Sequence, residues 1–282
     1  MIPHVRRISD GSAAWIAFVA GAALPLGFAP FGIYGLIVVS LAVLWLLWEG
    51  RQPWIAGRIG FAWGTGAFLA GTYWLYISIH IFGGAPAPLA VFLMLCLVAI
   101  MALYPAVAGY VAARWLPDGV IRWLVALPAL WALTEIVRGW LASGFPWLSL
   151  GYGMSDGPLR GYASLSGVYG VSLATAIVAG ATVLLLAGSA RQRTGAAVFL
   201  SVVVLAGHAL SGVQWTRTDG GELRVALIQG AVSQDKKWLL SELEPTKTLY
   251  RELTRENLDV DLIVWPEAAI PAIASDELPY LE

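Results

Sequence analysis

One acidic residue near the end of the sequence stands directly after a short apolar run. Residues 262–266 are rich enough in β-branched and aromatic side chains for a buried strand, and Pro266 ends that strand just before Glu267. A second strand is expected at 223–229, with a helix between the two. This order favours a parallel pair, and open α/β sheets place their sites beyond the carboxyl ends of such strands. Glu267 is therefore a candidate for chemistry.

The neighbours of Glu267 indicate which chemistry to expect. Trp265, Pro266 and residues 268–270 are apolar, so the sequence predicts a partly desolvated carboxylate, as suits a general base. The alternative interpretation is an acid that caps a following helix.

Two further ionisable residues, Glu135 and Arg138, are three apart and therefore neighbours on one helical face. They follow a long apolar stretch, and ionisable groups at membrane depth are candidates for function. The alternative is an ion pair at the outer end of a membrane helix, with Arg138 reaching the interface.

The segment that follows, 139–152, is aromatic and apolar but is broken by glycines and by Pro146. Its aromatic residues would form an interfacial belt if the segment only marks the membrane surface. If it lies on the same side as the polar end of the chain, it would instead floor a lipid-binding cavity. Phe145 and Trp147 would then lie along the path of the acyl chains, because aromatic side chains offer large apolar area.

Composition indicates a membrane protein. Hydrophobic residues make up 59% of the 282 residues, charged residues only 12%, and the mean hydropathy is +0.73. Soluble chains average about 45–50% apolar and about 25% charged residues. The net charge of −1 gives no reason to expect nucleic acid. Cys96, the single cysteine, excludes a disulfide framework, and no residues stand at metal-ligand spacing, so no metal or other cofactor is expected.

The charges divide the chain into two parts. Residues 1–212 hold 15 charged residues, none of them lysine, whereas residues 213–282 hold 20. We therefore expect a transmembrane helical domain over 1–212 and a water-facing α/β domain over 213–282. The link between them is expected at 214–222, where a Thr-Asp-Gly-Gly run breaks regular structure.

About seven transmembrane helices are expected in the first part, since several apolar spans reach the about 20 residues that a crossing needs. The spans are 13–29, 31–48, 59–79, 87–113, 123–137, 163–188 and 196–212. In the third span, Gly60 and Gly64 permit close contact between helices.

Arginines indicate how the spans are threaded. With the N-terminus in the cytoplasm, the outer loops hold only Arg138 and Arg160, and the remaining eight arginines of 1–212 lie on the cytoplasmic side. The odd number of spans then places the polar end of the chain outside. Alternatively, 13–29 is a cleavable signal, since Ala20-Gly21-Ala22 resembles a cleavage site.

Taken in order, these motifs resemble those of bacterial apolipoprotein N-acyltransferases. The polar part looks like the start of that family's nitrilase-type domain, on the motifs Val-Ala-Leu-Ile-Gln-Gly (225–230), Gln-Asp-Lys-Lys-Trp (234–238) and Ile-Val-Trp-Pro-Glu-Ala-Ala-Ile-Pro (263–271). The membrane part is similar on Phe-Gly-Gly (82–84), Pro-Ala-Leu-Trp (128–131), Thr-Glu (134–135), Arg-Gly-Trp (138–140) and Gly-Phe-Pro-Trp-Leu (144–148). The resemblance covers essentially all 282 residues, and the motifs are specific together, although a lone Trp-Pro-Glu is not.

The resemblance implies an activity and roles for two residues. The family transfers an acyl chain from a phospholipid to the N-terminal amine of a diacylglyceryl cysteine on an apolipoprotein. It does so through a cysteine thioester formed by a Glu-Lys-Cys triad. Glu267 matches the triad glutamate, as general base, and Trp238 matches a tryptophan near the substrate entrance. Arg138, Phe145 and Trp147 are the other candidates for substrate binding.

The remaining triad members find no match. No lysine follows Lys247, and Cys96 lies in the membrane part, so we expect the first half of such an enzyme, inactive as it stands. The implied partners are a phospholipid donor, a diacylglyceryl apolipoprotein acceptor and the bilayer. The implied location is the bacterial inner membrane, with several spans, a cytoplasmic N-terminus and a periplasmic nitrilase-like part. Two other classes stay open: a non-enzymatic seven-helix transporter or binding scaffold, and a membrane-tethered nitrilase-like amidohydrolase.

Overall fold

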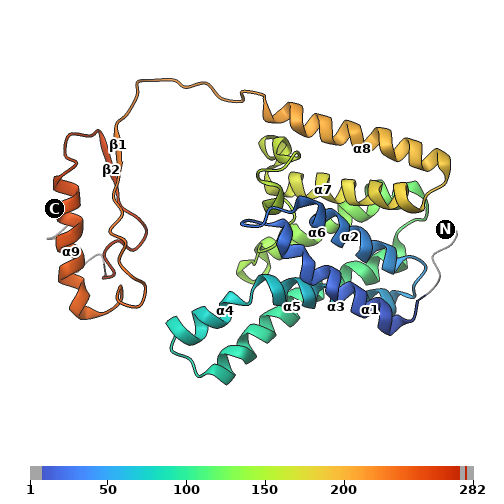
Figure 1. The fold of residues 1–282 in the computed structure, drawn as a ribbon, viewed down its shortest axis with the longest axis horizontal. Helices are drawn as coiled ribbons and strands as arrows, with labels where there is room; N and C mark the ends of the chain where they lie inside the picture. Colours follow the sequence, from blue (N-terminus) through green and yellow to red (C-terminus); the bar gives the residue numbers. More distant parts are fainter. Residues whose placement is uncertain (1–7, 274–276, 278–282) are drawn as a thin grey trace. The chain divides into compact units, whose positions relative to one another are not determined.

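The computed structural model describes residues 8–273 and residue 277. The chain forms two compact units, Met1–Trp215 and Thr216–Glu282, and each is considered by itself. Figure 1 shows the first unit as a set of helices and the second as a single helix beside two short strands.

Eight α-helices make up the described part of the first unit: α1 (Asp10–Ala23), α2 (Tyr34–Trp48), α3 (Pro53–Gly71), α4 (Trp74–Ile77), α5 (Ala87–Trp115), α6 (Leu127–Trp140), α7 (Ala163–Ala187) and α8 (Ala190–Ser211). Two π-helical turns extend these helices, Ser78–Phe82 after α4 and Arg122–Ala126 before α6. Short 3₁₀ turns occupy Leu24–Gly27, Leu141–Ser143, Tyr152–Met154 and Arg160–Tyr162.

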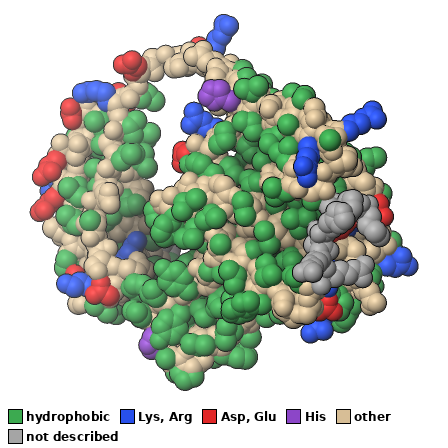
Figure 2. All heavy atoms as spheres, turned by 45° about the vertical axis from the view of Figure 1, so that its right-hand side comes forward, with side chains coloured by type: hydrophobic (Ala, Val, Ile, Leu, Met, Phe, Trp, Pro, Cys, Tyr) green, Lys and Arg blue, Asp and Glu red, His purple; other side chains and the backbone are tan. Residues whose placement is uncertain are grey.

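Five helical segments of the described chain are long and apolar enough to cross a membrane: Asp10–Gly27, Ala87–Trp115, Arg122–Ser143, Arg160–Ala187 and Ala190–Ser211. The helix α2 is apolar but has only 15 residues, fewer than the about 20 of a straight crossing. Hydrophobic side chains cover most of the face of the helical unit in Figure 2, where charged side chains are sparse. A surface of this kind suits lipid.

The predicted span at 59–79 has the wrong boundaries. The helix α3 begins earlier, at Pro53, and ends at Gly71. At this end, both the backbone N–H and the hydroxyl of the C-cap residue Thr72 donate to the Phe68 carbonyl oxygen. The chain then restarts as α4 and the π-helical turn, which together with the start of α5 form a hairpin.

The helix α3 packs against both α1 and α5. A Cβ atom at Gly60 would lie 2.2 Å from the Pro105 carbonyl oxygen of α5, and one at Gly64 would lie 2.6 Å from Pro105 Cγ. Only a residue without a side chain permits this approach, so the predicted close contact at Gly60 and Gly64 is confirmed.

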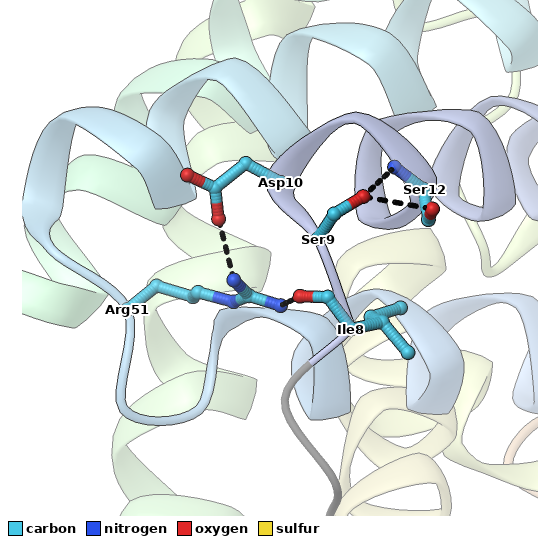
Figure 3. A network of polar contacts seen from close by, with 5 residues as sticks. All are labelled: Ile8, Ser9, Asp10, Ser12 and Arg51. Carbon is cyan, nitrogen blue, oxygen red and sulfur yellow. Dashed lines mark hydrogen bonds and ion pairs between the residues drawn. The ribbon is translucent and has the colours of Figure 1, made fainter.

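Polar contacts tie the start of α1 to the turn between α2 and α3. Figure 3 shows the Ser9 hydroxyl accepting from the backbone N–H of Ser12, as an N-cap does. The Arg51 guanidinium pairs with Asp10 and donates to the Ile8 carbonyl oxygen at 2.9 Å. These contacts fix where α1 begins.

A second arginine joins three helical segments in the same unit. Buried Arg122 lies 3.4 Å from a carboxylate oxygen of Glu49, the residue after α2. It also donates to the Ala112 carbonyl oxygen of α5 at 3.0 Å. Because a charge in this position needs partners, Arg122 links the ends of α2 and α5 to the start of the π-helical turn.

The second unit consists of β1 (Val225–Leu227), α9 (Leu240–Arg255) and β2 (Leu262–Val264). The strands are parallel, with Ala226 opposite Ile263, and both residues pack toward a small core of Ile228, Tyr250 and Ala269. Both strands are shorter than the predicted 223–229 and 262–267. The described residues form a two-stranded sheet, in which each strand has one neighbour. Beyond the paired residues, the Ile228 N–H still donates to the Val264 carbonyl oxygen at 2.9 Å, and the Leu262 N–H donates to the Arg224 carbonyl oxygen.

Candidate functional site

The connection between α6 and α7 has an unusual backbone. Ala142, Ser143 and Leu148 have φ angles of 54°, 75° and 60°, in the left-handed region that residues with a Cβ rarely adopt. Such conformations persist where surrounding contacts impose them, and they cluster at functional sites. Side chains of α6 and α7 hold the part of this connection that contains Leu148.

Arg138 lies in the last turn of α6 and is only 5% exposed. Its guanidinium donates to the Phe145 carbonyl oxygen at 3.0 Å, to the Trp147 carbonyl oxygen, and to the Ser149 hydroxyl at 3.1 Å. The group also lies over the Phe68 ring of α3, 5.3 Å from its centre. Arg138 therefore contacts loop backbone, and its side chain does not reach the surface.

Glu135, one turn earlier, is 3% exposed. Its Oε1 accepts from the Trp131 indole N–H and from the Leu150 backbone N–H, each at 3.0 Å. No salt bridge joins Glu135 to Arg138 within the described residues. The alternative in which Arg138 reaches outward from the helix end does not fit its burial: both side chains turn inward and hold the loop.

Two of the predicted substrate-binding residues share an aromatic cluster. The rings of Phe145 and Trp147 stack with their centres 6.3 Å apart, and Trp74 of α4 lies 5.2 Å from Trp147. Trp147 is 48% exposed, and Phe145 is half-buried. Nothing in the sequence pattern selects Trp74, because its short helix falls inside the longer span expected at 59–79.

A small cavity lies behind this loop. It is lined by Trp63, Phe68, Tyr104, Trp131, Glu135, Arg138 and neighbouring apolar residues, and its volume is about 20 Å³. That is room for about one water molecule. An acyl chain would not fit there, so a lipid would have to lie on the exposed side of the loop.

In the second unit, Glu267 follows β2 and Trp238 follows β1, so both come after the carboxyl ends of the parallel strands. The Lys237 ammonium donates to the Glu267 carbonyl oxygen at 3.4 Å, which brings the two segments together. Trp238 is 62% exposed. Glu267 is exposed as well, so the expected partial desolvation is wrong for this unit: its apolar neighbours do not cover the carboxylate.

Two other charged groups of this unit have shifted pKa values. A hydrogen bond from the Ser233 hydroxyl lowers the pKa of Asp235 below its ordinary value. Hydrogen bonds to Glu244 and Glu277, at 2.8 Å each, raise the pKa of Lys247. Both groups are therefore charged at neutral pH, and Lys247 ties α9 to residue 277.

The other residues considered from the sequence have ordinary surroundings. Cys96 is an unpaired, partly buried thiol on α5. His80 Nδ1 lies 2.8 Å from the Ala85 carbonyl oxygen, and the ring packs against Tyr76. Among residues 8–273 and 277, no three or more His, Cys, Asp or Glu side chains gather as a metal site would require.

Comparison with known proteins gives a consistent result. Residues 20–181 match the family model described as "Apolipoprotein N-acyltransferase N-terminal domain". The chain is 42% identical over 270 residues to an apolipoprotein N-acyltransferase of Photobacterium profundum, covering 95% of this chain and 52% of the relative. A Vibrio cholerae relative of the same name is 42% identical over 259 residues, covering 91% and 50%. One from Pseudomonas putida is 39% identical over 273 residues, covering 95% and 54%. The chain spans about half the length of these relatives.

Proposed function

This chain belongs to the apolipoprotein N-acyltransferase family, and from this premise we propose that it contributes the membrane part and the catalytic base of such an enzyme. The reaction would move an acyl chain from a phospholipid to the N-terminal amine of a diacylglyceryl cysteine on a lipoprotein. The similarity to named relatives over 95% of the chain carries this proposal.

In the proposed first step, the Glu267 carboxylate takes the proton of a cysteine thiol, and the thiolate attacks an ester carbonyl carbon of the phospholipid. The ester C–O bond breaks, and the lysophospholipid leaves with a proton from Glu267. In the second step the amine attacks the thioester, Glu267 takes an amine proton, and the thiol is restored as the amide forms. Splitting the transfer in this way replaces one difficult step by two easier ones.

The thiol would come from outside these 282 residues, because Cys96 is their single cysteine and lies on α5. The chain by itself would then be inactive. The lysine that the family uses at the oxyanion would likewise come from outside these 282 residues. For residues 213–282 we propose the first β-α-β part of a nitrilase-like domain, with β1, α9 and β2 as its elements.

For residues 1–212 we propose a seven-span membrane domain in the bacterial inner membrane, with the N-terminus in the cytoplasm and the second unit in the periplasm. Five long apolar segments support several crossings, and α2 and α3 would supply the other two. The distribution of arginines supports the orientation.

Phe145, Trp147 and Trp238 are proposed to contact the lipid chains, since each offers exposed or half-exposed aromatic surface.

The proposal is tested by joining these 282 residues to the part of the Photobacterium profundum relative beyond the matched region. The fusion protein is given acyl-labelled phospholipid and a synthetic peptide with an N-terminal diacylglyceryl cysteine. We expect label on the peptide amine, and none when the added half is supplied alone. Transport or hydrolysis of small amides without any labelled peptide would contradict the proposal and favour one of the two other classes.

A further inference from the structure

Three buried side chains from two helices hold the backbone of residues 145–151. Arg138 donates to the carbonyl oxygens of Phe145 and Trp147, and Glu135 accepts from the N–H of Leu150 at 3.0 Å. On α7, the Ser172 hydroxyl accepts from the N–H of Gly151 at 2.9 Å. Side chains therefore form hydrogen bonds with both carbonyl oxygens and N–H groups of the loop backbone, as a neighbouring strand would in a sheet.

These contacts are more than a helix connection requires. Placing Glu135 and Arg138 inside an apolar helical unit is costly, because each loses its hydration. The loop they hold is itself strained at Leu148, whose φ is 60°. A relaxed polar turn would join α6 to α7 without either cost, so the particular shape of the loop is what these contacts maintain.

The shape of the loop determines which of its side chains are buried and which are exposed. Leu148 packs toward α3, where its Cδ1 lies 2.5 Å from the position that a Cβ on Gly71 would take. Trp147, the preceding residue, is half-exposed and packs against Trp74 and Phe145. The cavity behind the loop has room for about one water molecule, so an acyl chain does not fit there, and this exposed aromatic face is the surface that the loop offers to an apolar ligand.

We propose that Glu135, Arg138 and Ser172 are positioning residues that hold the loop so that the aromatic face of Trp74, Phe145 and Trp147 is formed before an acyl chain of the phospholipid donor arrives. The inference rests on the proposed function for the identity of the ligand. It assigns Arg138 a role through the loop backbone in place of direct contact with substrate, and it adds Ser172 and Trp74 to the site. Forming the face in advance lowers the ordering cost of binding.

The loop is tested first, by amide hydrogen exchange on the full 282-residue chain in phosphatidylcholine nanodiscs. Ser172→Ala removes the acceptor for Gly151 and should speed exchange of the peptide containing Leu150 and Gly151 by about tenfold. The matched control is Ser40→Ala. Ser40 is also a buried serine that bridges helices, donating to the Ala20 carbonyl oxygen and accepting from Trp63, but it is not in contact with the loop. Its replacement should leave exchange of the loop unchanged.

Lipid binding is then measured in the same nanodiscs as cross-linking of a phospholipid with a photoreactive acyl chain to the peptide that carries Trp147. Ser172→Ala should lower the cross-linked fraction several-fold, and Ser40→Ala should not. Arg138→Lys separates shape from charge, because lysine keeps the charge but cannot reach two carbonyl oxygens and a hydroxyl with one planar group. We expect Arg138→Lys to behave like Ser172→Ala.

If Ser172→Ala leaves the exchange rate of the loop peptide unchanged, the inference is overturned. It is also overturned if exchange in this variant becomes faster but the cross-linked fraction of lipid stays at the parental level. Parental exchange and cross-linking in Arg138→Lys would overturn it too, because charge alone would then suffice. Failure of the proposed function looks different: the unmodified chain would show a protected loop and no cross-linked lipid. That result would overturn the ligand assignment together with the function.

Discussion

At the scale of single residues, the proposed chemistry depends on Glu267. Its carboxylate is exposed beyond the carboxyl end of β2, so replacing it by an amide should leave the second unit folded. In the fusion protein, Glu267→Gln should lower the rate of thioester formation by about 10²-fold or more, since the proton acceptor is lost. Enzyme-bound label from acyl-labelled phospholipid measures this rate.

The matched control is Glu256→Gln, which neutralises another exposed carboxylate in the same unit, at the end of α9. It should keep the parental rate. Thioester that accumulates at the parental rate in Glu267→Gln would show that another group is the base.

Trp147 gives a second prediction at this scale. Trp147→Ala should raise KM for a long-chain phospholipid by about tenfold, because burying one large apolar side chain contributes about 1.5–3 kcal/mol. A short-chain soluble ester should acylate the enzyme almost as before. Trp140→Ala is the control, since Trp140 is equally large and 66% exposed but belongs to no described ring pair. Equal losses with both donors would identify Trp147 as a structural residue.

Residue type and spacing suffice to propose Glu267, Trp147 and Arg138 as candidates, but they do not predict the surroundings of these side chains. The sequence puts Glu135 and Arg138 on one helical face, yet nothing in it says that both would turn toward loop backbone. Ser172 escaped notice because its role exists only where α7 passes the loop, 21 residues away along the chain. Contacts of that kind are set by packing, which one sequence does not display.

At the scale of helices and strands, the close contact between α3 and α5 should be sensitive to substitution. Gly60→Ala would place a Cβ 2.2 Å from the Pro105 carbonyl oxygen, so the two helices must separate. We expect a loss of about 1–3 kcal/mol in the free energy of unfolding. Gly35→Ala is the control, because its Cβ on α2 would meet nothing within 4 Å. Thermal unfolding in detergent compares them, and equal midpoints would contradict the close contact.

The elements differ in how far the sequence predicts them. Long apolar runs predict α5 and α7 well, because lipid selects for composition along the whole length of a helix. For α8 they predict the end but not the start, which lies at Ala190 and not at 196. The sequence does not predict the end of α3, since the C-cap residue Thr72 interrupts no apolar pattern. The strands were placed but overextended, because strand ends depend on neighbours.

At the scale of the whole molecule, the threading of the chain is a prediction of its own. Cysteines placed at Ser189, between α7 and α8, and at Ser233, in the second unit, should be labelled from opposite sides of the membrane in a Cys96→Ala background. Ser189 should react from the cytoplasm, as the arginines of 1–212 indicate. A membrane-impermeant thiol reagent on right-side-out and inverted vesicles provides the measurement. Labelling of both positions from one side would contradict a crossing by α8.

The charge density of the sequence changes near residue 212, and the boundary between the two compact units lies between Trp215 and Thr216. Composition predicts such a boundary because lipid excludes charge while water favours it. It does not predict the number of crossings, since α2 is short and α3 less apolar than its neighbours. Those two helices are the reason that seven spans remain a proposal.

The central proposal, transfer through an acylated enzyme, is tested most directly by the intact mass of the fusion protein. After incubation with a single defined phospholipid, the mass should rise by that of one acyl group. Addition of the diacylglyceryl-cysteine peptide should then return the enzyme to its starting mass while the peptide gains the same acyl group. An enzyme whose mass never rises, or whose acyl group is lost to water and never appears on the peptide amine, would contradict the proposal.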